Sequence, residues 1–181
     1  MLMKVFPHGI GEGDKPSRYL VRPDYPGRDT APPQVLRGDP AMTRALIDSI
    51  ERRWKFTSGV LAWHPDDCVS EQQENAVMDA FEHVAFAGLE EDQRNILWVR
   101  HTHAGHHELH FLIPRLELSS GKDFNACPPG WQKDFDVFRD LFNWREGWAR
   151  PDEPARRREV LPKNATFFRA RLDRLGQELW A

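Results

Sequence analysis

The chain has 181 residues, of which 40% are hydrophobic and 29% charged, as in an ordinary soluble globular protein. No apolar run approaches the roughly 18–20 residues of a membrane span, and the N-terminus lacks a signal-peptide pattern, so we expect no membrane association. The two cysteines, Cys68 and Cys127, form no close motif. This fits a cytoplasmic protein and argues against a disulfide scaffold or a cysteine-based zinc site.

The net charge of −3 by itself counts against a nucleic-acid partner, because phosphate contacts favour a basic surface. The charges are unevenly spread, however, since residues 56–93 hold nine acidic side chains and no lysine or arginine. The rest of the chain then has 25 basic and 19 acidic residues, a net charge of +6. The acidic block is consistent with one solvated helix face turned away from DNA, or with an ordinary scatter of surface charge.

In the first part of the chain, short strands and helices are expected to alternate. A strand is predicted at 1–6, followed by a glycine-rich loop at 8–15 and a helix at 17–21, with Pro16 in its first turn. After a proline-rich loop, a short strand is predicted at 35–37. Asp39 and Pro40 are then typical of a helix N-cap and of the first helical position.

The second part of the chain begins with a predicted strand at 56–63. Ser70 and Gln73 have the spacing of a capping box, and apolar residues at helical intervals extend the predicted helix over 70–86. Two apolar runs at 95–103 and 106–114 predict a hairpin closed tightly by Ala104 and Gly105. A loop follows at 118–130, and helices are predicted at 132–144 and 165–180.

This order of elements predicts an α+β sandwich in which helices cover one face of an antiparallel sheet. The other face would then be free for a ligand. We expect one domain at 1–150 and a helical C-terminal extension at 151–181 that belongs to a longer protein.

Five of the eight histidines lie within residues 101–110. In a hairpin closed by Ala104 and Gly105, His103 lies opposite His106 and His101 lies opposite Glu108, and residues two apart on a strand point to one face. The side chains expected on that face are His101, His103, His106, Glu108 and His110. Two imidazoles and a carboxylate from this set suit a divalent metal such as Mn²⁺ or Mg²⁺, with the remaining histidines in support or binding nothing. The alternative is an exposed polar hairpin tip.

Tyr19 and Tyr25 are the two tyrosines of the chain, and Tyr19 follows the glycine-rich loop at the start of a predicted helix. A protonated phenol is a poor nucleophile, but neighbouring cations such as Arg18 and a metal would favour its reactive form. From these residues alone, the simpler interpretation is a half-buried tyrosine that packs on the sheet.

Taken together, these motifs resemble the relaxase/mobilization nucleases of mobilizable plasmids, especially the colicin-plasmid branch, within the wider HUH endonucleases. The similarity covers about residues 1–150. Its clearest parts are SRYL at 17–20, TSGVL at 57–61, ILWVRH at 96–101 and ELHFLIP at 108–114, continuing to residues 117–118 and 121–122. In that branch a His-Glu-Asn set binds the metal. This sequence matches its first two members at His101 and Glu108, but has His110 in place of the asparagine.

The resemblance implies a ferredoxin-like, or palm-like, fold and a metal-dependent DNA relaxase. Tyr19 would attack a scissile phosphate at a plasmid transfer origin, form a 5′-phosphotyrosyl intermediate and later rejoin the strand, in the service of conjugative mobilization. His101, Glu108 and His110 would hold Mg²⁺ or Mn²⁺, with His103 and His106 behind them. The expected partners are single-stranded origin DNA and accessory relaxosome proteins.

Basic side chains on either side of the hairpin are expected to contact the DNA. Those near Tyr19 or beyond the hairpin are Lys15, Arg18, Arg22, Arg28, Arg150, Arg156, Arg157 and Arg158. Trp131, Trp144 and Trp148 alternate with arginines and suit base stacking. For Phe138 and Phe142, the inner stripe of an ordinary helix is the preferred interpretation.

Three other functions fit the same motifs. A non-cleaving origin-binding module would shift DNA without forming a covalent adduct. A replication initiator or transposase of the HUH superfamily would share the same chemistry. An unrelated metallohydrolase would turn over substrate without needing Tyr19.

Overall fold

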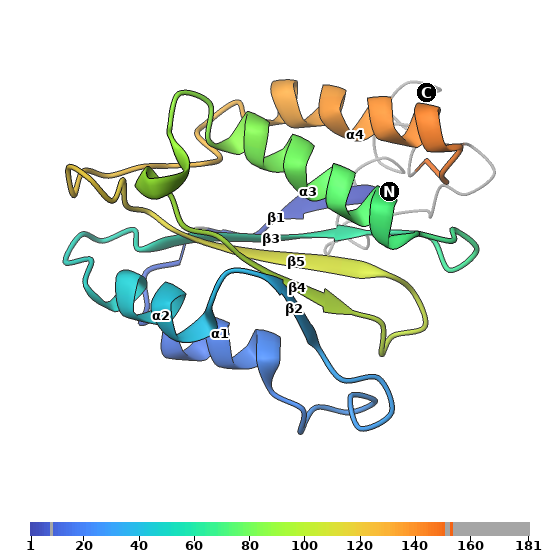
Figure 1. The fold of residues 1–181 in the computed structure, drawn as a ribbon, viewed down its shortest axis with the longest axis horizontal. Helices are drawn as coiled ribbons and strands as arrows, with labels where there is room; N and C mark the ends of the chain where they lie inside the picture. The colour runs from blue at the N-terminus through green and yellow to red at the C-terminus, as the bar shows by residue number, and fades with distance from the viewer. Residues whose placement is uncertain (8, 151–152, 154–181) are drawn as a thin grey trace, which may run out of the picture. The chain divides into compact units, whose positions relative to one another are not determined.

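Five strands form one antiparallel sheet in the order β1-β3-β5-β4-β2 (Figure 1). A computed structural model describes residues 1–7, 9–150 and 153. In chain order its elements are β1 (Leu2–Val5), α1 (Asp14–Val21), β2 (Gln34–Arg37), α2 (Pro40–Asp48), β3 (Phe56–Ala62), α3 (Glu71–Ala85), the short 3-10 helix η1 (Glu91–Gln93), β4 (Leu97–His101), β5 (Glu108–Pro114) and α4 (Gln132–Glu146). The predicted α+β class is confirmed. The predicted extension at 151–181, with its helix at 165–180, lies almost wholly outside the described residues.

Helices cover both faces of the sheet, with α1 and α2 on one side and α3 and α4 on the other (Figure 1). The expectation of helices on one face only is therefore wrong. The physical reason is that β4 and β5 are apolar on both faces, as strands buried on both sides must be. Buried residues on the α1 and α2 side are Leu20, Ile47, Leu97, Val99 and Leu112. Those on the opposite side include Val77, Phe81, Trp98, Phe111 and Phe135.

The helix starts follow the capping residues in the sequence. The Asp39 side chain accepts a hydrogen bond from the Met42 backbone N–H at 2.6 Å, so α2 begins at Pro40 as predicted. Ser70 and Gln73 form the predicted reciprocal capping box at the start of α3. Helix α1 begins earlier than predicted, at Asp14. A carboxylate in the first turn is favourable there because it faces the positive end of the helix dipole.

The hairpin of β4 and β5 keeps the predicted register, with His101 opposite Glu108. The strands are shorter than expected, however, and residues 102–107 form a loop in place of a two-residue turn. The Gly105 backbone N–H bonds to the Thr102 carbonyl at 3.1 Å, and Gly105 has a φ of 78°, which favours glycine. The predicted pairing of His103 with His106 is therefore wrong, because the loop forms its own turn at these positions.

Helix α4 closes the core on the α3 side. Phe135, Phe138 and Phe142 are buried along its inner face, as predicted for the last two. Among the described residues, no helix combines the length and the apolar character that crossing a membrane requires.

Candidate metal centre

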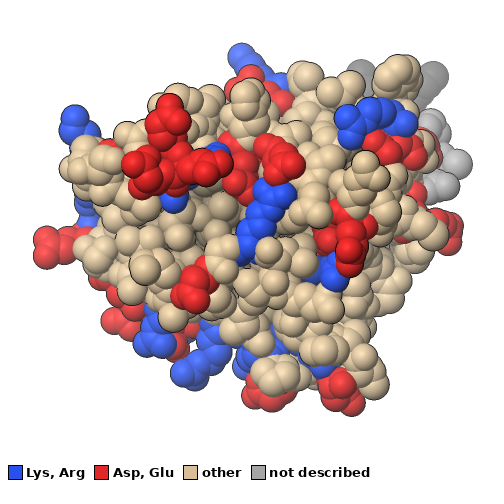
Figure 2. Space-filling view, viewed as in Figure 1, with Lys and Arg blue, Asp and Glu red and all other residues tan. Residues whose placement is uncertain are grey.

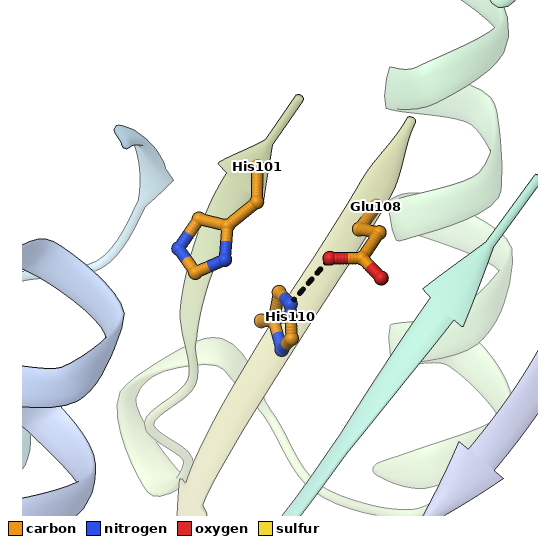
Figure 3. Close-up of side chains that lie close together, drawn as sticks. All are labelled: His101, Glu108 and His110. Carbon is orange, nitrogen blue, oxygen red and sulfur yellow. Dashed lines mark hydrogen bonds and ion pairs between the residues drawn. The ribbon is translucent and has the colours of Figure 1, made fainter. Parts of the chain in front are cut away.

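Three side chains at the end of the β4–β5 hairpin converge on one point (Figure 3). His101 is the last residue of β4, and Glu108 lies directly opposite it as the first residue of β5. His110 lies two residues further along β5 and therefore points to the same face. One donor atom from each of the three lies within 4.8 Å of the others. The register of β4 and β5 thus brings together the three residues that the family resemblance implied as metal ligands.

The imidazole of His101 is 1% exposed, and contacts at both ring nitrogens determine its tautomer. Its Nε2 lies 2.8 Å from the Leu20 carbonyl oxygen, which can only accept, so Nε2 carries the proton. Nδ1 then carries the lone pair, which accepts a hydrogen bond from the Arg28 guanidinium at 3.3 Å, and a metal ion bound at Nδ1 would take the place of this hydrogen bond. Burial is the main cause that lowers the pKa of His101 from 6.5 to about 4, which keeps the ring neutral at physiological pH.

Glu108 carries the negative charge of the cluster. Its Oε2 lies 3.2 Å from His110 Nε2, and its Oε1 lies 3.0 Å from His106 Nε2. The hydrogen bond from His110 is the largest cause that lowers the pKa of Glu108 from 4.5 to about 2, so this carboxylate is ionised at neutral pH. A neutral imidazole held by a backbone carbonyl, a second imidazole and an ionised carboxylate form a donor set that suits a divalent metal ion.

The two remaining hairpin histidines lie beside this set. His106 donates to Glu108, whereas the His103 ring packs edge-on to His101 with ring centroids 5.4 Å apart. Burial, and next the charge of Arg28, lower the pKa of His103. His106 is therefore placed to orient Glu108, and His103 is placed to cover the ring of His101.

Helix α1 brings Tyr19 to the cluster from a distant part of the chain. Tyr19 is 42% exposed, and its ring lies edge-on to His101 with centroids 6.4 Å apart. The next residue, Leu20, supplies the carbonyl that holds His101 Nε2. One turn of α1 therefore positions both the phenol and the tautomer of a candidate ligand.

Arg28 is the basic residue that lies against Tyr19, and it is fully buried. Its Nη1 donates to the Tyr19 carbonyl at 2.6 Å and to the Arg22 carbonyl at 3.0 Å. Its guanidinium carbon lies 5.0 Å from the centre of the Tyr19 ring and 4.8 Å from that of Tyr25. Arg28 was expected on the DNA-binding surface, but the structure places it in the interior, where it links α1 to His101.

Tyr25 is a residue of this site that the sequence reasoning missed. Its ring lies 5.7 Å from that of Tyr19 and 5.8 Å from that of His103, measured between centroids. The only indication in the sequence was that Tyr25 and Arg28 lie in the proline-rich loop directly after the predicted α1 helix. Nothing local in that loop predicts that it folds back onto the hairpin.

Comparison with known proteins identifies the chain's relatives. It is 40% identical over 172 residues to cryptic plasmid protein C of Neisseria gonorrhoeae, a match that covers 91% of this chain and 81% of that protein. It is 36% identical over 166 residues to DNA relaxase MbeA of Escherichia coli, covering 91% of this chain. The chain belongs to the plasmid mobilization relaxase family.

The resemblance inferred from the sequence motifs is therefore confirmed. The match spans 31% of the length of MbeA. No protein-family model and no solved structure matches the chain.

The other basic residues expected to contact DNA in this relaxase-family chain differ in accessibility. Lys15 and Arg18 are exposed on α1, although Arg18 also pairs with Asp14 at 3.5 Å. Arg22 is half-buried beside Asp24, and Arg150 is exposed. Arg156, Arg157 and Arg158 lie outside the described residues. Lys15 and Arg18 are thus the exposed cations on the helix that carries Tyr19.

The tryptophans expected to stack on bases have different environments. Trp148 is 5% exposed and packs against Phe142 in the core, whereas Trp131 is half-buried. Trp144 is 79% exposed, so it is not part of the inner stripe of α4. Of the three, Trp144 alone presents its ring to solvent.

The acidic block at 56–93 lies mostly on and after α3, across the sheet from α1. Figure 2 shows acidic side chains gathered at the upper left, over the end of α3 and the η1 segment. Two members of the block, Glu74 and Glu82, instead point inward and pair with arginines. The block therefore combines a solvated acidic surface with two structural carboxylates.

Proposed function

We propose that this chain nicks one strand of DNA at a plasmid transfer origin and later rejoins it, using Tyr19 as the nucleophile. The relaxase name of MbeA supports DNA nicking in general. The observation that carries the more specific proposal is that α1 packs the Tyr19 ring edge-on to His101, a member of the His101–Glu108–His110 set.

The candidate ligands would hold Mg²⁺ or Mn²⁺. When bound, such an ion polarises a phosphate oxygen and offsets the charge that develops in the transition state. Glu108 supplies the negative charge that a divalent cation requires, while His101 and His110 supply nitrogen donors. His103 and His106 support this set from the loop between the strands.

In the nicking step, the Tyr19 phenol oxygen forms a bond to the scissile phosphorus and the bond to the 3′ oxygen breaks. The phenol loses its proton, and the departing 3′ oxygen takes one up, so neither water nor a net proton is consumed. The product is a 5′-phosphotyrosyl link and a free 3′ hydroxyl. Because the bond energy is conserved in the ester, attack by a 3′ hydroxyl reverses the step and rejoins the strand.

Arg28 assists by holding the residues around the nucleophile. Its guanidinium fixes the Tyr19 backbone carbonyl and lies against the Tyr19 ring, where a positive charge favours developing negative charge on the phenol. The exposed Lys15 and Arg18 would contact DNA phosphates next to the nick, with Arg22, Arg150 and Arg156–Arg158 extending the contact. Accessory relaxosome proteins would present the origin as a single strand for conjugative mobilization.

Incubation with labelled single-stranded origin DNA and Mn²⁺ tests this proposal. The protein should form a covalent adduct that survives denaturing electrophoresis, and Tyr19→Phe should abolish it. Tyr25→Phe is the matched control, because Tyr25 lies against the same guanidinium but packs on His103, whereas Tyr19 packs on the candidate ligand His101. This variant should retain adduct formation.

Two outcomes would contradict the proposal. Adduct formation that persists in Tyr19→Phe would show that another residue is the nucleophile. A shifted band without any adduct in the unaltered chain would favour the non-cleaving origin-binding module.

A further inference from the structure

We propose that Glu74 is a positioning residue for the candidate metal centre, which it serves from the opposite face of the sheet. It would hold the last residues of β4 and the first of β5 in register, so that His101 and Glu108 stay opposed. This inference rests on the metal site of the proposed function, because positioning has meaning only if these residues are ligands.

The Glu74 carboxylate binds two residues that each precede a candidate ligand. Its Oε2 accepts from Arg100 Nη1 at 2.9 Å, and its Oε1 lies 2.9 Å from His107 Nε2. Arg100 directly precedes His101, and His107 directly precedes Glu108. Neighbouring residues of extended backbone point to opposite faces, and His107 is the loop residue that leads directly into β5. The two partners of Glu74 therefore lie directly behind the two ligands.

Glu74 occupies a position that packing alone would assign to an apolar residue. It is 2% exposed and lies on the buried face of α3 with Val77, Met78 and Phe81. A buried carboxylate is costly unless it is paired and hydrogen-bonded, and an apolar replacement often serves stability equally well. The presence of a carboxylate at this position is better explained by the geometry that it imposes on its two partners than by stability.

The Glu74 contacts lie at the loop end of the β4–β5 hairpin. His101 and Glu108 form the last pair of the ladder before the loop at 102–107, and strand ends are where local opening begins. A slip of one residue by either strand would turn that strand's ligand to the opposite face of the sheet, away from the other ligand. The six-residue loop does not enforce the register as a two-residue turn would. A carboxylate that binds both strand ends supplies that constraint.

Further contacts connect the same residues to the rest of the sheet. Arg100 also donates to the Gln34 side chain of β2. The His107 carbonyl accepts from the Trp63 backbone N–H at 3.0 Å, and the His107 ring packs edge-on to Trp63. Glu74 is therefore the central acceptor of a network that reaches β2, β4, α3 and the residue following β3.

The test compares Glu74→Leu with Glu82→Leu. Glu82 is a matched control because it lies further along α3, is 13% exposed in its side chain, and bonds to Arg37 and to the Trp98 indole at 3.0 Å. It touches neither neighbour of the ligands. Mn²⁺ dissociation constants are measured by electron paramagnetic resonance of the unbound ion. Amide hydrogen exchange is measured at residues 101 and 108 in metal-free protein.

We expect Glu74→Leu to weaken Mn²⁺ binding about tenfold, the lower end of what partners of metal ligands contribute, and to accelerate exchange at both amides. Adduct formation at saturating Mn²⁺ should stay within about twofold of the unaltered protein, because the bound ion itself draws its ligands together. Glu82→Leu should change neither binding nor exchange at residues 101 and 108. Glu74→Gln should restore binding, since its amide can accept from Arg100 and donate to His107.

Equal effects of Glu74→Leu and Glu82→Leu on both measurements would overturn the inference. If Glu74→Leu does not fold, Glu74→Asp takes its place in the comparison, because the shorter side chain cannot reach both Arg100 and His107. Unchanged Mn²⁺ binding in Glu74→Asp would also overturn the inference. If the unaltered protein binds no Mn²⁺, the metal site of the proposed function fails. In that case, amide exchange still reports separately whether Glu74 holds the strand ends.

Discussion

Acidification of the metal-free protein from pH 6.5 to pH 4 should destabilise the fold through His101, and His101→Gln should remove most of that loss. The pKa of His101 is lowered from 6.5 to about 4, mainly because the ring is buried. Over this range the unfolded chain binds a proton at His101 that the folded chain does not bind. Stability therefore falls as the pH decreases through the interval.

The size of the effect follows from the two pKa values. One pKa unit corresponds to about 1.4 kcal/mol, so the difference between 6.5 and about 4 corresponds to about 3 kcal/mol of unfolding free energy. Glu108 does not offset this loss. Its pKa is about 2 in the folded chain and 4.5 in the unfolded chain, so its contribution to stability is also lost, not gained, as the pH falls from 4.5 towards 2. The lowered pKa of His103 acts in the same direction as that of His101.

Urea unfolding at pH 7, 6, 5 and 4 in the presence of a chelator measures this loss. His101→Gln serves as the comparison because its amide can still donate to the Leu20 carbonyl but does not titrate. The difference in unfolding free energy between the two proteins should shift by about 3 kcal/mol across the range, to the disadvantage of the unaltered protein at low pH. Parallel pH profiles for the two proteins would refute the reasoning that His101 is buried in its neutral form.

Two further predictions concern a ligand and the packing of the sheet. Glu108→Gln should weaken Mn²⁺ binding by more than about tenfold, measured by calorimetry, because it removes the negative charge of the set. Glu117→Gln, which lies outside the set beside the turn at 118–120, should not, and equal affinities of the two variants would remove Glu108 from the ligands. Gly59→Ala should lower the unfolding free energy by about 2–3 kcal/mol in denaturant titrations, because the added Cβ would lie 2.3 Å from the Phe111 ring and 2.5 Å from the Lys4 carbonyl. Gly11→Ala, with no atom within 4 Å, is its control, and an equally small effect of both would contradict the close packing of β3 on Phe111.

Local patterns in the sequence were sufficient for the elements and for part of the site. Asp39 and Ser70 predicted helix starts correctly because a cap interacts with backbone only three residues away. The opposition of His101 and Glu108 was predicted correctly because Ala104 and Gly105 lie at the centre of the loop between the strands, although this loop is longer than the expected two-residue turn. The same counting placed His110 on the ligand face, since side chains alternate along a strand.

Other features of the site required the tertiary structure. Arg28 was expected at the surface because arginine usually lies there, yet it is buried between α1, Tyr25 and His101. The helices on both faces of the sheet were not expected either. Whether a side chain is buried depends on which distant segments of the chain pack against it, and local sequence patterns do not predict that packing.

The sequence by itself therefore determined the approximate strand positions, two helix caps and the side chains that share the ligand face, because each depends on residues within one turn or one hairpin. The choice of His101, Glu108 and His110 within that face came from the family resemblance. Only the tertiary structure decided that α1 lies against the end of β4, which places Tyr19 beside His101 and Leu20 on its ring nitrogen. It likewise decided that Glu74 reaches the far side of the same hairpin. These contacts arise from the packing of whole helices on a sheet, and their energy is shared among many apolar side chains in both cores.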